Sequence, residues 1–79
     1  MDFHLAFVIA ELDNGHVNVR RAAAAYAIGD TPAGDGAKDA ALDARAAAMR
    51  SMEYSSEGDH ADLQNRIDAL KTAIDGLRA

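Results

Sequence analysis

The feature that most constrains the fold is a regular spacing of large aliphatic residues near the carboxyl end of the chain. These residues follow one another at intervals of four, three, four and three positions, which is the spacing of a helix that packs lengthwise against another helix. The sequence therefore predicts a helix over residues 59–78 that buries one apolar side. This heptad seam consists of Leu63, Ile67, Leu70, Ile74 and Leu77.

The preceding segment offers a surface on which the heptad seam can pack. Over residues 38–54 most apolar positions are alanine, and Leu42, Met49 and Met52 supply the larger side chains. An alanine face lets a second helix approach closely, so we expect residues 37–79 to form an antiparallel helical hairpin. The seam covers only about two heptads, fewer than a free-standing coiled coil usually has. Packing within the chain and packing between chains therefore both stay open.

The amino-terminal part is expected to contain two helical segments. Residues 2–13 place apolar side chains on most sides of a helix, and a glycine in the following Asn14-Gly15 pair is typical of a helix end. Residues 18–28 contain an alanine run of high helix propensity. A β-hairpin over residues 2–19 is the alternative, because alternating apolar residues flank Asn14-Gly15, a strong two-residue turn signal.

One segment has the composition of a loop. Residues 29–36 read Gly-Asp-Thr-Pro-Ala-Gly-Asp-Gly and hold the only proline and three of the six glycines. Proline and glycine are the strongest local breaks in regular structure. We therefore expect a hinge here, with Asp35 or Gly36 capping the helix that follows.

These segments predict an all-α protein, a small three- to four-helix bundle with a carboxyl-terminal antiparallel helical hairpin. A single domain covers residues 1–79, with helical segments over 1–28, a loop over 29–36 and the hairpin over 37–79. So short a chain buries a modest share of its surface and usually needs a disulfide, a metal or an oligomer as support. The chain has no cysteine, and its three histidines are far apart in sequence. We therefore expect a homodimer or a higher oligomer.

The charge balance bears on the partner. Asp and Glu outnumber Lys and Arg by 13 to 8, which gives a formal net charge of −5. Nucleic-acid-binding proteins usually carry a clustered basic surface, so nucleic acid is disfavoured and a basic protein partner is favoured. The amino-terminal apolar run lacks the basic start of a signal peptide and the length of a membrane span. We expect a cytoplasmic protein with no membrane partner.

The sequence contains no motif that predicts a chemical reaction or a ligand site. Gly29 and Gly34 have the spacing that opens a phosphate-binding loop, but Asp35 stands where that motif requires lysine. Asp30, Asp35 and Asp39 lack the alternate-residue spacing of a calcium loop. No serine or histidine stands in a nucleophile–base pattern. We therefore expect no enzyme activity, no catalytic residue, no cofactor and no metal site.

A short stretch resembles the first helix of a helix-turn-helix. Arg20 and Arg21 are followed by small residues and an apolar pair before a glycine-containing turn. The resemblance implies a DNA-binding regulator that uses these two arginines. Residues 31–36 depart from the pattern, because a recognition helix presents Arg, Lys, Gln or Ser to the bases.

The leading hypothesis is a non-enzymatic protein-binding module, such as a bacterial or phage regulator or inhibitor that occupies the surface of a partner protein. The alternatives are a structural assembly or adaptor subunit of a phage particle or larger complex, and the DNA-binding regulator. Self-association or helix packing is assigned to the heptad seam together with Leu42 and Met49. The predicted partner contacts are an acidic stripe, one further acid and two aromatic residues: Asp35, Asp39, Asp43, Glu53, Phe3 and Phe7.

Overall fold

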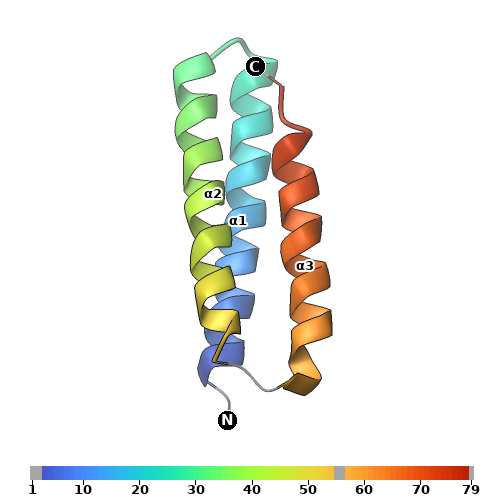
Figure 1. The fold of residues 1–79 in the computed structure, drawn as a ribbon. Coiled ribbons are helices and arrows are strands. Elements are labelled where there is room, and N and C mark those ends of the chain that lie inside the picture. Colours follow the sequence, from blue (N-terminus) through green and yellow to red (C-terminus); the bar gives the residue numbers. More distant parts are fainter. Residues whose placement is uncertain (1–2, 55–56, 79) are drawn as a thin grey trace.

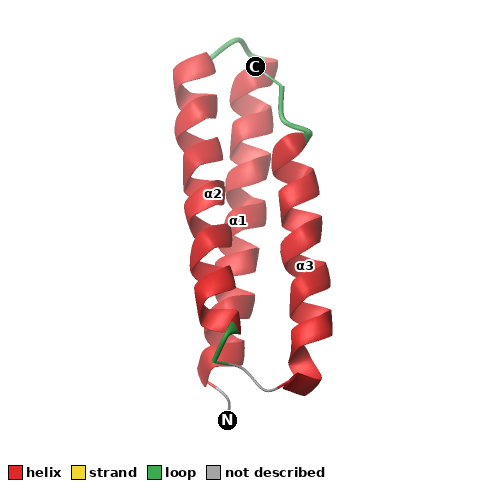
Figure 2. Cartoon of the chain, in the orientation of Figure 1, coloured by secondary structure: helices red, strands yellow, loops and turns green. Residues whose placement is uncertain are grey.

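The computed structural model describes residues 3–54 and 57–78, without the side chains of Phe3, His4 and Glu57. Three helices account for nearly all of this part of the chain: α1 (Phe3–Ala27), α2 (Thr31–Met52) and α3 (Glu57–Asp75). They lie side by side, and helices that are consecutive in the chain run in opposite directions (Figure 1). The described residues include no strand (Figure 2). The predicted all-α class is therefore confirmed.

The first helix is continuous through Asn14 and Gly15. The predicted break at this pair, and the alternative hairpin over residues 2–19, are both wrong. Gly15 is buried and faces Leu70 of α3, so the glycine serves close packing here and not a turn. The side chain of Asn18 donates a hydrogen bond to the backbone carbonyl of Asn14, 3.0 Å away, which satisfies this buried amide within the helix.

Most of residues 29–36, expected as a loop and hinge, belongs to α2. The capping residue is Asp30, whose carboxylate accepts a hydrogen bond of 3.2 Å from the backbone N–H of Ala33. Pro32 lies in the first turn, where its missing N–H costs no hydrogen bond. Only Gly29 has a left-handed backbone in the described chain, with φ of 80°, and it lies in the turn after α1. The connection between α1 and α2 is therefore three residues long, Ile28 to Asp30.

The three helices pack unequally. α1 and α2 approach each other much more closely than either approaches α3. Small side chains allow this approach, because the buried residues of α2 are one glycine and three alanines. The more distant α3 contributes large aliphatic side chains to the core instead. Its four large buried residues, each at most 1% exposed, are Leu63, Ile67, Leu70 and Ile74.

The heptad seam is thus used within the chain, where it meets Val8 and Leu12 of α1 and the alanines of α2 in one core. The alanines of α2 do not serve α3 alone, since α1 is the nearer neighbour. The last seam residue, Leu77, lies beyond the end of α3 and is half-buried. No helix in the described ranges combines the length and apolar character needed to cross a membrane.

Candidate functional site

The residues predicted as partner contacts are on the surface wherever their side chains are described. Asp35, Asp39 and Asp43 are exposed along α2, and Glu53 is exposed at its carboxyl end. On α1, Phe7 is 46% exposed. The side chain of Phe3 lies outside the described part of the structure, so its predicted contact stays a prediction.

Two residues assigned to helix packing or self-association, Leu42 and Met49, lie at the edge of the core. Their side chains are 43% and 40% exposed. Because they are seven residues apart, two helical turns bring them to the same side of α2. Further residues at intervals of three or four positions share that side. We call the set the α2 strip: Lys38, Leu42, Ala46, Met49 and Glu53.

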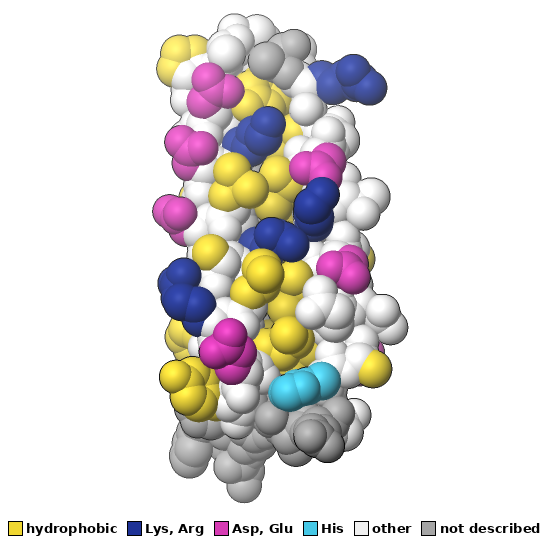
Figure 3. Space-filling model, in the orientation of Figure 1, with side chains coloured by type: hydrophobic (Ala, Val, Ile, Leu, Met, Phe, Trp, Pro, Cys, Tyr) yellow, Lys and Arg dark blue, Asp and Glu magenta, His cyan; other side chains and the backbone are white. Residues whose placement is uncertain are grey.

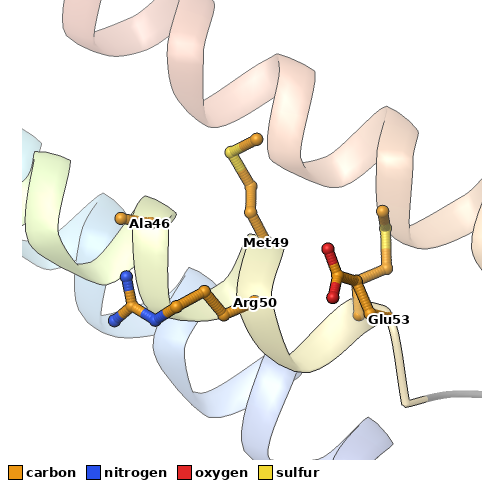
Figure 4. A pocket seen from close by; sticks show the side chains of 5 residues that line it. Ala46, Met49, Arg50 and Glu53 are labelled. Carbon is orange, nitrogen blue, oxygen red and sulfur yellow. The ribbon is translucent and has the colours of Figure 1, made fainter.

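A pocket of about 370 Å³ hollows the carboxyl-terminal half of the α2 strip. Figure 4 shows its lining side chains: Met49 extends toward α3, whereas Arg50 extends away from it. The surface is therefore apolar at its centre, with Arg50 and Glu53 at its margin. The sequence alone did not predict this pocket, although the spacing of Leu42 and Met49 was the signal for it. The lining residues are Ala46, Met49, Arg50, Met52 and Glu53.

Basic side chains lie between α2 and α3 beside the strip. Figure 3 shows hydrophobic side chains along this junction with Lys and Arg side chains among them. A hydrogen bond from Lys71, 2.7 Å from the Asp75 carboxylate, holds the pKa of Asp75 below its usual value, and the positive charges of Lys71, Arg45 and Lys38 add to this effect. Arg45 also buries its Nε, which has no hydrogen-bond partner among the described residues. The junction therefore carries positive charge even though the whole chain is acidic.

The acidic stripe begins at a contact between α1 and α2. The hydroxyl of Tyr26 donates a hydrogen bond of 2.6 Å to Asp35. This bond raises the pKa of Tyr26 to about 12, and desolvation and the charges of Asp35 and Asp39 act in the same direction. Gly34 is needed beside the ring, because a Cβ at this position would overlap Tyr26. Asp35 thus has a structural partner within the chain, while Asp39 and Asp43 follow it along the surface.

The Tyr26 contact predicts a specific response to alkaline pH. In a Tyr54→Phe chain, whose only tyrosine is Tyr26, the phenol is expected to ionise near pH 12 rather than the ordinary 10.0. The Tyr26 phenol of the unfolded chain then loses its proton at a lower pH than the phenol of the folded chain. The contribution of the Tyr26–Asp35 hydrogen bond to the free energy of unfolding is therefore complete below pH 10 and is lost as the pH rises from about 10 to 12. Ultraviolet absorbance of the phenolate measures the titration. Adding Asp35→Ala should move the pKa back toward 10, and identical titrations in the two chains would contradict the assignment.

The site that emerges is a contact surface formed by an apolar strip, a pocket and borders of both charges. Across residues 3–54 and 57–78, no cluster of three or more His, Asp or Glu side chains is placed to hold a metal ion. Four residues of this surface were not predicted as contact residues from the sequence: Lys38, Ala46, Arg50 and Met52. Comparisons of the chain with models of protein families, with curated proteins and with solved structures find no match.

Proposed function

We propose that the protein is a non-enzymatic protein-binding module and that the α2 strip is its binding surface. The observation that carries the proposal is the partial exposure of Leu42 and Met49 beside a pocket, on a helix whose other side is packed in the core. Neighbouring exposed apolar side chains with a polar margin commonly mark a surface that binds another protein. Methionine and arginine, both present here, are also enriched at such interfaces.

The charges around the strip support a selective contact. Asp39, Asp43 and Glu53 are exposed beside its apolar centre, and the chain carries a formal net charge of −5. Complementary charge increases the rate of association and discriminates among partners more than it raises affinity. In this proposal α2 and α3 act as an antiparallel hairpin within a three-helix bundle, and α3 supports the strip through the heptad seam. A small regulator or inhibitor that occupies a partner surface, acting in the cytoplasm, fits this arrangement.

The DNA-binding alternative gains no support from the arrangement of the helices. The helices of a helix-turn-helix cross at roughly 90–120°, whereas α1 and α2 run side by side in opposite directions (Figure 1). Arg20 and Arg21 lie within the continuous α1 and not in a short helix before a turn to a recognition helix. The protein-binding proposal is therefore preferred.

The proposed function is tested by affinity capture from cells of the source organism with three forms of the full chain. The wild type is compared with the double variant Leu42→Asp, Met49→Asp and with a control, Ala69→Asp, that adds an acid at an exposed position of α3. We expect proteins that the wild type and the control retain and the double variant loses, and we expect raised salt to weaken their binding. The same set of proteins on all three forms would overturn the proposal. Circular dichroism confirms that each form is helical.

A further inference from the structure

We infer that the partner of the α2 strip is the α2 strip of a second copy of this chain, docked antiparallel about a two-fold axis. This inference rests on the proposed function, because it names the partner of the same surface. A two-fold contact requires a surface that is complementary to itself. Two copies can therefore dock in this way only if the residues of the strip match when the strip is reversed.

The strip is matched about a point just before Ala46. Lys38 and Glu53 lie equally far from this point in opposite directions, and so do Leu42 and Met49. Antiparallel pairing about it places Lys38 of each copy opposite Glu53 of the other, and Leu42 opposite Met49. Each pairing brings together opposite charges or two apolar side chains. Parallel pairing would instead oppose Lys38 with Lys38 and Glu53 with Glu53, so the charges select the antiparallel orientation.

The pocket fits this register. It is lined by Ala46, Met49 and Glu53 among others, and its volume is about 370 Å³. In the antiparallel pair, Leu42 of the second copy lies at the level of Met49, next to the opening of the pocket. Because Leu42 is 43% exposed in the single chain, its side chain is available to enter. The two-fold axis repeats this insertion, so each copy both fills a pocket and has one filled.

The charged residues beside the strip are also complementary between the two copies. Asp39, Asp43 and Arg50 are exposed, and by helical periodicity they share the flank of the strip that faces away from α3. A two-fold axis perpendicular to two antiparallel helices brings the same flank of both copies together. The level of Arg50 in one copy then falls midway between Asp39 and Asp43 of the other. This pairing shows how a chain with a net charge of −5 can associate with itself through local attraction.

The test is charge reversal measured by light scattering after size exclusion, at several concentrations of the full chain. The wild type is expected to form a dimer. Lys38→Glu and Glu53→Lys should each weaken it at least about tenfold in Kd, because each places like charges opposite one another. The double variant should regain the wild-type Kd. Arg20→Glu, which changes the net charge by the same amount as Lys38→Glu on exposed α1, should leave the dimer unchanged.

Two features of the design separate the interface from effects on the fold. Glu53→Lys places a cation at the carboxyl end of α2, which favours the helix, so a weaker dimer of this variant is not explained by unfolding. Lys38→Glu also removes an attraction to Asp75 within the chain. That loss persists in the double variant, so recovery of the dimer identifies the contact with Glu53 of the other copy.

A wild-type chain that stays monomeric at every concentration overturns the inference, and so does a dimer that neither single reversal weakens. Failure of the double variant to recover the dimer overturns it too. The capture experiment remains a separate test of the proposed function. If the chain is monomeric but other proteins depend on Leu42 and Met49 for binding, the proposed function stands with a different partner. If the chain is monomeric and no other protein depends on these residues, both proposals fail.

Discussion

Replacing Leu70 with alanine is expected to lower the free energy of unfolding by about 2–5 kcal/mol. The Leu70 side chain is completely buried and belongs to the row that holds α3 against the other helices. Because α1 and α2 already contact each other closely, they have little freedom to close around the space that the leucine leaves. A small domain has a total stability on the order of 5–15 kcal/mol, so this substitution removes a large share of it.

Urea denaturation followed by circular dichroism measures this effect, with Leu42→Ala as the matched control. The control removes the same atoms from a side chain that is 43% exposed, so we expect a loss below about 1 kcal/mol. Both variants are compared at a protein concentration at which light scattering finds the monomer, since association would add to apparent stability. Equal losses at the two positions would contradict the assignment of Leu70 to the core and Leu42 to the surface.

The sequence predicted the part of the fold that depends on periodicity within one helix. Four of the five seam residues are buried as expected, because heptad spacing is a local property that one helix displays by itself. The choice of neighbours is not local. The sequence suggested that the alanines of α2 pack mainly against the seam, whereas α1 approaches them more closely than α3 does.

The two errors in helix boundaries have different physical origins. Asn14-Gly15 is a typical turn sequence, but in the structure Gly15 packs against Leu70. Leu70 lies far along the chain, so no local pattern could reveal this contact. Between α1 and α2 the sequence does contain a signal for the start of a helix, but the number of glycines in residues 29–36 favoured a loop instead. Asp30 followed by Pro32 is a typical helix start, with an acid as cap and a proline in the first turn.

The candidate site was predicted only in part, for a related reason. The acidic residues of α2 are exposed as their charge suggests, but the exposure of Leu42 and Met49 depends on how far α3 lies from α2. From hydrophobicity alone, both residues were assigned to helix packing or self-association, without a choice between the two. The symmetric placement of Lys38 and Glu53 was readable from the sequence, but it gained meaning only when the side of α2 that faces outward was known.

Replacing Gly15 with alanine is expected to destabilise the protein, although alanine is the better helix former by about 1 kcal/mol. An ideal Cβ at this position would lie 2.6 Å from Cδ2 of Leu70, so the fully buried leucine side chain must shift to make room for it. Overpacking of this kind costs about 1–3 kcal/mol and outweighs the gain in propensity. The control is Gly36→Ala in α2, where a Cβ meets nothing within 4 Å, so stability should rise by up to about 1 kcal/mol.

A double-mutant cycle locates the cause of the Gly15→Ala effect. If the new methyl group destabilises the protein by its contact with Leu70, then shortening Leu70 to alanine gives that methyl group space to occupy. The combined variant should therefore lose less stability than the sum of the two single losses, by about 0.5–3 kcal/mol. Strict additivity in urea denaturation would mean that the two positions do not touch, and the close packing of α3 on the middle of α1 would then be wrong.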